Sequence, residues 1–375
     1  MPTWPIRKQG QANTAPMSTI LSITTDRKTG GIATALASYS AALAQRGHRH
    51  VVLLPSGAAA VNGLSGMDSV RLITMPAAMI RFHLLTGAVL HGRLRAAIGA
   101  ADAVFTHNAR LAPMARRCRR PVCLISHSGK LRHLEAADHV VFLSRAAESR
   151  ARARLGPDHP DHPQIHVIPH GFPACDTPPR PSSSSGPVRV LAAGRFVPKK
   201  GFESLLQAAG LLRQRGMAVR FDIYGDGPLR PVLAEMIDRL GLDHVTLHGW
   251  RPSLDQAFAE ADLFCLPSLE EPFGLVLGEA MGWGLPVVAT STDGPLDVIG
   301  HDGTGPEQTL RAGGMLTAPG DAAGLADTLA FLAGDRNRLA TAGAAAHQRV
   351  TTDFGMEALA DRLEGLIAKA CRPQP

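Results

Sequence analysis

Two glutamates eight residues apart, Glu271 and Glu279, enclose a segment whose residue types suit an anion site. Residues 267–281 read PSLEEPFGLVLGEAM and follow a predicted strand. Pro272 suits the first position of a helix because it has no amide hydrogen to leave unpaired. The amides that would point out of this helix start are those of Phe273, Gly274 and Leu275. With the helix dipole they would bind an anion, with Glu271 beside it and Glu279 about two turns further along the helix.

A second cationic element precedes this segment. Residues 194–201 read GRFVPKKG and follow the predicted strand 188–192. The guanidinium of Arg195 can fork to phosphate oxygens, and Lys200 adds a point charge. Together with the helix start they would hold one diphosphate. The plainer alternative is a solvated loop beside an ordinary helix start.

Alternating strands and helices must position these residues. The first part of the chain predicts a helix at 33–45 and strands at 19–24, 51–54, 103–105, 122–125, 140–143 and 165–168. The second predicts strands at 188–192, 219–224, 245–247, 263–267 and 286–289, and helices at 202–215, 229–240, 254–261, 273–283 and 356–370. Short apolar strands that alternate with helices predict parallel sheets, here in two doubly wound α/β domains whose ligands bind at the carboxyl ends of the strands.

The predicted organisation has five parts. Residues 1–16 are polar and lack the apolar stretch of a signal peptide, which favours a disordered tail. Residues 173–187 read PACDTPPRPSSSSGP, a linker composition. The domains are then expected at 17–172 and 188–352, with a closing helix in 353–375.

Charge is unevenly distributed between the two halves. The net charge is +7; residues 1–187 hold 22 Lys and Arg against 9 Asp and Glu, and the remainder 17 against 23. A basic half suits an anionic membrane, a nucleic acid or an anionic substrate, or is solvated surface. Aromatic residues make up 5%, which argues against stacking on single-stranded nucleic acid. The five cysteines form no CxxC pair, which favours a reducing cytosol over a disulfide framework or zinc ribbon. The sequence contains no stretch of eighteen apolar residues without a charge, so no membrane span is expected.

Three motifs together resemble the retaining glycosyltransferases of the GT-B class, in the large family-4-type group with the Glu-x7-Glu motif. They are GRFVPKKG, then IYGDGPL at 223–229, then LPSLEEPFGLVLGEAMGWGLPVVAT at 266–290. Nearer the amino end, the segments Thr106-His107-Asn108, Ile125-Ser126-His127 and 167–171 (VIPHG) are also similar. The segment 292–297 (TDGPLD) departs from the family's commoner Gly-Gly-x-Pro-Glu.

The resemblance implies two Rossmann-like domains facing each other across a cleft, with the last helix crossing back to the first domain. Arg195, Lys200 and the amides at the helix start would hold the diphosphate of a nucleotide-sugar. Glu279 would accept hydrogen bonds from the ribose hydroxyls. Glu271 would contact a hydroxyl of the transferred sugar, and Arg195, Lys200 and Glu271 would be catalytic.

Other implied roles are spread along the chain. Gly31 would let the amino-terminal loop approach the donor, and His127 would lie near the sugar and the reaction centre as a fourth catalytic residue. The base of the nucleotide would sit near Gly225 and Arg251. His107 is expected to be structural. The cluster at 158–162 (DHPDH) is not expected to bind metal, because it lies in a Pro-rich loop.

The implied activity is transfer of a hexosyl group from a UDP-, GDP- or ADP-sugar to a glycan or lipid-linked acceptor, in lipopolysaccharide or exopolysaccharide assembly. Neither metal nor cofactor is expected, and the setting is the cytoplasm, with peripheral association at the inner membrane face. The alternatives are a catalytically silent nucleotide-sugar-binding protein of the same fold, a nucleic-acid binder and an NAD-dependent oxidoreductase. The last is disfavoured because no GxGxxG fingerprint follows a predicted strand.

Overall fold

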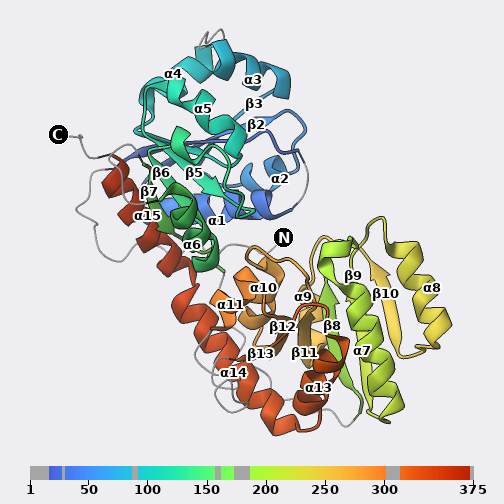
Figure 1. Cartoon of the computed structure of the whole chain (residues 1–375). Coiled ribbons are helices and arrows are strands. Elements are labelled where there is room, and N and C mark those ends of the chain that lie inside the picture. The colour runs from blue at the N-terminus through green and yellow to red at the C-terminus, as the bar shows by residue number, and fades with distance from the viewer. Residues whose placement is uncertain are drawn as a thin grey trace. The chain divides into compact units, whose positions relative to one another are not determined.

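The computed structural model describes residues 17–27, 30–86, 92–156, 162–172, 186–300 and 313–371, and these form two compact units (Figure 1). The amino-terminal unit comprises the described residues up to Gly171 together with those from Met356 onward. The carboxyl-terminal unit comprises Phe172–Gly355. The predicted tail 1–16, most of the predicted linker 173–187 and residues 158–161 of the acidic and histidine cluster lie outside the described residues.

The amino-terminal unit is built on a parallel sheet of seven strands in the order β3-β2-β1-β4-β5-β6-β7. The strands are β1 Thr19–Ile23, β2 Arg49–Pro55, β3 Val70–Met75, β4 Ala103–Thr106, β5 Val122–Ser126, β6 His139–Phe142 and β7 Gln164–Val167. All side chains of β4, β5 and β6 are buried. Helices cover both faces of this sheet, which explains why its central strands are apolar almost throughout.

The helices of this unit include the one that closes the chain. They are α1 Gly31–Gln45, α2 Ala60–Leu64, α3 Ala77–Thr86, α4 Gly92–Ala100, α5 Ala112–Ala115, α6 Arg145–Leu155 and α15 Met356–Ala370, with single 3-10 turns at Ala109–Leu111, Arg116–Cys118 and Leu134–Ala136. The apolar face of α15 packs in one core cluster with Tyr39 and Leu43 of α1 and with Phe105 of β4. Arg46 at the end of α1 also forms ion pairs with Glu357 and Asp361 of α15.

The carboxyl-terminal unit is a second parallel sheet, of six strands in the order β10-β9-β8-β11-β12-β13. The strands are β8 Val188–Ala193, β9 Val219–Tyr224, β10 Val245–Gly249, β11 Leu263–Leu266, β12 Val287–Thr290 and β13 Gly314–Thr317. The helices are α7 Phe202–Gln214, α8 Arg230–Leu240, α9 Asp255–Glu260, α10 Leu275–Gly282, α11 Asp293–Ile299, α13 Ala322–Ala333 and α14 Arg336–Asp353, with a 3-10 turn at Pro198–Lys200.

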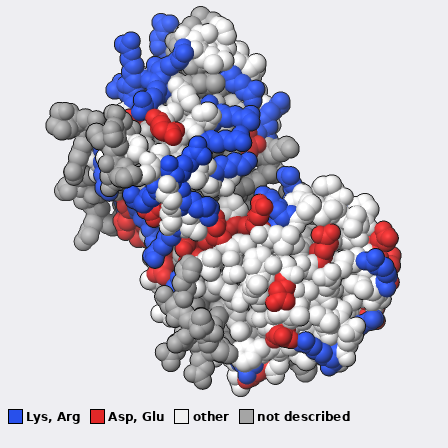
Figure 2. Space-filling view, in the orientation of Figure 1, with Lys and Arg blue, Asp and Glu red and all other residues white. Residues whose placement is uncertain are grey.

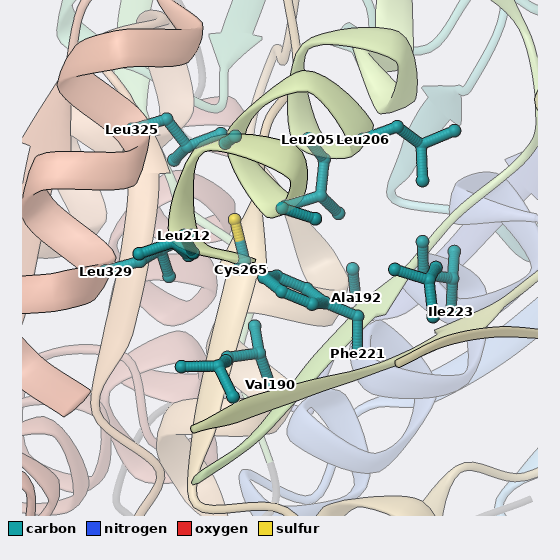
Figure 3. Packing of buried hydrophobic residues seen from close by; sticks show 14 of the residues in the cluster. Val190, Ala192, Leu205, Leu206, Leu212, Phe221, Ile223, Cys265, Leu325 and Leu329 are labelled. Carbon is teal, nitrogen blue, oxygen red and sulfur yellow. The ribbon is translucent and has the colours of Figure 1, made fainter. Parts of the chain in front are cut away.

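One large apolar core holds this second unit together. Figure 3 shows Val190, Ala192, Phe221 and Ile223 of the sheet packed beneath leucines of α7 and α13, with Cys265 among them. Cys265 is fully buried, so here it acts as a small apolar side chain. This core fixes the carboxyl ends of β8 and β11 side by side, and the loops with the charged motifs leave from those ends.

The sequence predicts the fold class correctly, as two doubly wound parallel sheets, but misses several elements. The edge strand β3 was not predicted because only two of its side chains are buried. The short strand β13 begins with a glycine, and the helices α3, α4, α13 and α14 lie in stretches for which the sequence analysis offered no element. None of the described helices is both long enough and apolar enough to cross a membrane.

Candidate nucleotide-sugar site

The charged motifs meet at the point where the strand order of the carboxyl-terminal sheet reverses. From β8 the chain proceeds to β9 and β10 on one side, and then returns to β11 on the other side of β8. The loop after β8 carries Arg195 and Lys200, and the loop after β11 carries Glu271. In open α/β sheets the crevice outside such a reversal is where ligands bind.

Lys200 and Glu271 form an ion pair across this reversal. The Lys200 ammonium contacts Oε2 of Glu271, and the hydroxyl of Ser268 donates to the same oxygen at 3.1 Å. The side chains of Lys200 and Glu271 are 19% and 9% exposed, so water screens this pair less than a surface pair. The family resemblance implies the lysine on a phosphate and the glutamate on a sugar hydroxyl; the structure brings the two into contact with each other.

Backbone contacts hold the two loops together. The amides of Leu269 and Glu270 both donate to the carbonyl of Lys199, at 2.8 and 3.1 Å. Gly201 has φ +64°, and a Cβ added there would lie 2.0 Å from the carbonyl oxygen of Pro267. Only glycine lets the chain pass this closely, so the position of Lys200 opposite Glu271 depends on it.

The third motif joins the same edge through its own backbone. The amide of Phe196 donates to the carbonyl of Asp226 at 2.9 Å, and the amide of Gly194 donates to that of Tyr224 at 3.0 Å. A Cβ on Gly225 would lie 1.9 Å from the carbonyl oxygen of Gly194. Gly225 thus lies directly against the loop that carries Arg195.

The helix start differs from the prediction in one respect. Helix α10 begins at Leu275, not at Pro272, because Gly274 takes a left-handed conformation with φ +89° that interrupts helical geometry. The side chain of Phe273 is buried against Phe172, with ring centroids 5.8 Å apart. The amides of Leu277 and Gly278 bond to the carbonyl of Gly274, so the amides left at the helix start begin with Leu275.

Glu279 therefore lies one turn into α10 and not two. Its carboxyl makes no hydrogen bond within the part of the chain that the structure describes. Burial, and secondarily the charge of Asp255, raises its pKa to about 7. A carboxyl group without a partner and poised near neutrality suits an acceptor of ligand hydroxyls.

Arg195 and Arg251 at this edge are exposed. The guanidinium of Arg195 makes no ion pair with any described residue, and Arg251 is likewise exposed. The segment 292–297, in which the sequence departs from the family pattern, also reaches this edge. The amide of Gly294 donates to the carbonyl of Glu271 at 3.0 Å, and a Cβ on Gly294 would lie 2.1 Å from Cα of Phe273.

Gly31 and His127 belong to the amino-terminal unit. Gly31 is the first residue of α1, where it exposes a helix start without a side chain. His127 follows β5 directly, and its Nε2 lies 2.9 Å from Nδ1 of His107. Burial lowers the pKa of His127 to about 4, so the imidazole is neutral at pH 7.

His107 belongs to a buried polar chain that the sequence analysis did not identify. Its Nε2 lies 3.2 Å from the hydroxyl of Ser22, which lies 2.8 Å from Nε2 of His50. Nδ1 of His50 lies 2.7 Å from the hydroxyl of Ser40. A signal for it was present, since His107 and His127 each follow a buried apolar residue of their strand, Phe105 and Ile125, by the two-residue period that returns to the same face.

Among the described residues no group of three or more His, Cys, Asp or Glu side chains is placed to hold a metal ion. The groups at the carboxyl-terminal edge that a ligand could contact include the guanidiniums of Arg195 and Arg251, an ammonium paired with a carboxylate, a helix start and a second carboxyl group. This set suits an anion that also bears hydroxyls.

Known proteins share this architecture. Residues 187–335 match the family described as glycosyl transferases group 1. Over the fold, the chain is similar to a solved structure of Anabaena Alr3699/HepE in complex with UDP-glucose, with a TM-score of 0.75 and 23% identity, covering 94% of this chain and 100% of that one.

Two curated relatives differ in how much they cover. The lipopolysaccharide core biosynthesis glycosyltransferase LpsE of Rhizobium meliloti is 32% identical over 48% of this chain and 49% of its own length. The GDP-mannose-dependent alpha-(1-6)-phosphatidylinositol monomannoside mannosyltransferase of Mycobacterium tuberculosis is 27% identical over 94% of this chain and 98% of its own. The chain spans half or less of the length of the first several relatives that it matches. The carboxyl-terminal unit, with its motifs at 194–201 and 267–281, is thus similar to the group 1 glycosyl transferases, and the two doubly wound sheets have the GT-B fold.

Proposed function

We propose that the chain is a retaining, metal-independent glycosyltransferase that moves a sugar from a nucleotide-diphosphate donor to a glycan or lipid-linked acceptor. The observation that carries this proposal is the meeting of Arg195, the Lys200–Glu271 pair and the start of α10 at one strand reversal. The relatives named for lipopolysaccharide core, colanic acid and exopolysaccharide support a role in the assembly of surface polysaccharides.

The proposed chemistry follows from where charge develops. When the bond between the anomeric carbon and the diphosphate oxygen breaks, positive charge forms on the sugar and negative charge on the diphosphate. Arg195, Lys200 and the amide of Leu275 stabilise the departing diphosphate by preorganised electrostatics. The acceptor oxygen bonds to the anomeric carbon on the face that the diphosphate leaves, and the acceptor proton passes to a phosphate oxygen. The ion pair in the free protein holds the Lys200 ammonium at the site until a phosphate competes for it.

Glu271 and Glu279 orient the donor in this proposal. Glu279 accepts from ribose hydroxyls, and Glu271 from a hydroxyl of the transferred sugar. The base lies near Gly225 and Arg251. In the amino-terminal unit, Gly31 lets its loop approach the donor, and His127 lies near the transferred sugar.

The test is a donor panel in the presence of EDTA. Thermal shift with UDP-, GDP- and ADP-sugars identifies the donor, and release of the nucleoside diphosphate measures turnover. We expect one donor to raise Tm and to turn over with EDTA present. A donor that binds without any turnover on a panel of acceptors would favour a silent binding protein, and strict dependence on Mg²⁺ or Mn²⁺ would contradict the metal-independent site.

We also propose that the amino-terminal unit contacts an anionic membrane surface. Figure 2 shows Lys and Arg side chains gathered over this unit. On α3 the side chains of Met79, Phe82 and Leu85, three residues apart, are 38%, 48% and 53% exposed, with Arg81 exposed among them. Exposed apolar side chains beside cations are the pattern of helices that lie in a membrane interface.

Vesicle flotation tests this contact. The chain should float with vesicles containing phosphatidylglycerol, less with vesicles of phosphatidylcholine alone, and less after Phe82→Ser with Leu85→Ser. Equal flotation with both kinds of vesicle, or none, would contradict the membrane contact and leave the transfer reaction untouched.

A further inference from the structure

The buried polar chain of the amino-terminal unit has a direction, and one fixed end sets it. The hydroxyl of Ser40 lies 2.7 Å from the carbonyl oxygen of Leu36. A carbonyl oxygen only accepts, so the single hydroxyl hydrogen of Ser40 is committed to it. The 2.7 Å contact between Ser40 and Nδ1 of His50 must then be bridged by a hydrogen on the histidine.

Each hydrogen bond in turn fixes the position of the hydrogen in the next one. His50 is neutral, because burial lowers its pKa to about 3; with its hydrogen on Nδ1, its Nε2 accepts from the hydroxyl of Ser22. Ser22 has then used its hydrogen and accepts from Nε2–H of His107. Burial, reinforced by the neighbouring histidines, holds the pKa of His107 well below its ordinary value, so its Nδ1 is bare. Nε2–H of His127 therefore donates to it at 2.9 Å.

The hydrogen-bond chain ends at Nδ1 of His127. With its hydrogen on Nε2, this neutral imidazole presents Nδ1 as a bare acceptor. That atom is shielded from solvent and has no hydrogen-bond partner among the described residues. A shielded acceptor without a donor is costly, and a ligand hydroxyl would remove the cost.

We propose that Ser40, His50, Ser22 and His107 are positioning residues whose one-way hydrogen-bond chain fixes His127 as the Nε2–H tautomer, so that Nδ1 accepts a hydrogen bond from a hydroxyl of the bound ligand. The identity of that ligand as a sugar rests on the proposed function, but the tautomer does not. The chain conducts no proton away from His127, because the carbonyl of Leu36 at its far end accepts none. His127 is thus an acceptor that selects a hydroxyl, and the chain behind it is not a path for a general base.

The tautomer is directly observable. In the full chain labelled with 15N-histidine at pH 7.5, the protonated and bare ring nitrogens of a neutral imidazole have well separated shifts. Signals lost in His127→Gln assign those of His127. We expect Nε2 protonated and Nδ1 bare in the wild-type protein.

Two variants interrupt the hydrogen-bond chain, and a matched control leaves that hydrogen-bond chain intact. Ser40→Ala removes the fixed end and Ser22→Ala removes the middle, so in each the two ring nitrogens of His127 should move towards a common shift as both tautomers become populated. Ser38→Ala is the control, because Ser38 is equally buried on α1 and donates to Thr34 at 3.1 Å outside the chain. A wild-type His127 protonated on Nδ1, or wild-type shifts in both Ser40→Ala and Ser22→Ala, would overturn the proposal. Because the readout needs neither donor nor turnover, a failure of the proposed function would leave it standing.

Discussion

The strand reversals of the two sheets carry different chemistry on the same topology. At the ends of β8 and β11 in the carboxyl-terminal unit the side chains are ionised, with an ammonium paired to a carboxylate and an exposed guanidinium beside them. In the amino-terminal unit the buried polar chain runs through Ser22 of β1, His107 after β4 and His127 after β5, and its members are neutral imidazoles and hydroxyls linked by hydrogen bonds. Exposed charged groups suit an anion that is bound and then released, whereas neutral groups of fixed orientation suit the recognition of hydroxyls.

The largest effect is expected from the substitution of Arg195. Because its guanidinium is exposed and has no ion-pair partner among the described residues, Arg195→Ala should leave Tm nearly unchanged. Turnover of the nucleotide-sugar should fall by roughly 10²–10³-fold, the usual loss when one preorganised hydrogen-bond donor to developing charge is removed. Lys199→Ala is the matched control, a neighbouring exposed cation whose side chain has no assigned role. Equal losses in the two variants would reduce the role of Arg195 to general surface charge.

The two units should respond to acid with opposite signs. In the amino-terminal unit the pKa values of His50 and His127, about 3 and 4, lie below the ordinary 6.5, so unfolding takes up protons and stability falls as the pH drops below 6.5. From pH 7.5 to 5 each imidazole should cost about 2 kcal/mol of unfolding free energy.

In the carboxyl-terminal unit the pKa of Glu279, about 7 against 4.5 for the ordinary group, lies above its unfolded value. Stability is then highest below pH 4.5 and decreases as the pH rises towards 7, so the same acidification should add about 2 kcal/mol. Hydrogen exchange read by mass spectrometry, corrected for intrinsic rates, measures protection for peptides of each unit separately. Protection that changes in the same direction in both units would refute the contrast.

The Lys200–Glu271 pair gives a smaller effect, on folding. Lys200→Met leaves the Glu271 carboxylate largely buried with only Ser268 as its partner among the described residues, which should cost about 1–3 kcal/mol of unfolding free energy. Glu271→Gln in the same chain should restore part of this loss, since it removes the unpaired charge. Urea denaturation followed by the fluorescence of Trp250 and Trp283 in the same unit measures both, with Lys199→Met as control. Additive effects of the two substitutions would show that the pair is not coupled.

The smallest expected effect concerns the pH dependence of donor binding. If ribose hydroxyls donate to Glu279, binding favours the ionised carboxylate, and affinity should rise about tenfold from pH 6 to pH 8 around a pKa of about 7. Glu279→Gln should flatten this dependence, because the amide does not titrate. Calorimetry across the range measures it, and an affinity that falls with rising pH would exclude the role of Glu279.

The sequence predicted the two sheets and the segments of the carboxyl-terminal site because these are written in local patterns. Apolar strands, helix formers and the motifs at 194–201 and 267–281 each occupy a short stretch. What it did not predict depends on contacts distant along the chain or on the backbone conformation of a single residue. The pairing of Lys200 with Glu271 joins residues 71 apart, and the start of α10 depends on the left-handed backbone of Gly274.

The spacing of His107 and His127 placed them on an inward face, but the connected polar chain of the amino-terminal unit was not predicted, for a related reason. In register, Ile20 of β1 lies opposite His50 of β2, which brings Ser22 within reach of His50. The chain then needs β4 beside β1 to bring His107 to the same face. Each residue alone is an ordinary buried polar group, and only the strand order makes four contacts into one directed chain.

Calorimetric titration of the chain in EDTA with the nucleoside diphosphate of the identified donor, and with the corresponding monophosphate, tests the central claim most directly. We expect the diphosphate to bind at least about tenfold more tightly than the monophosphate, since the second phosphate adds a contact to a charged donor. Arg195→Ala should abolish this preference, and Lys199→Ala should keep it. Equal affinity for the two nucleotides, or a preference that survives Arg195→Ala, would contradict the claim.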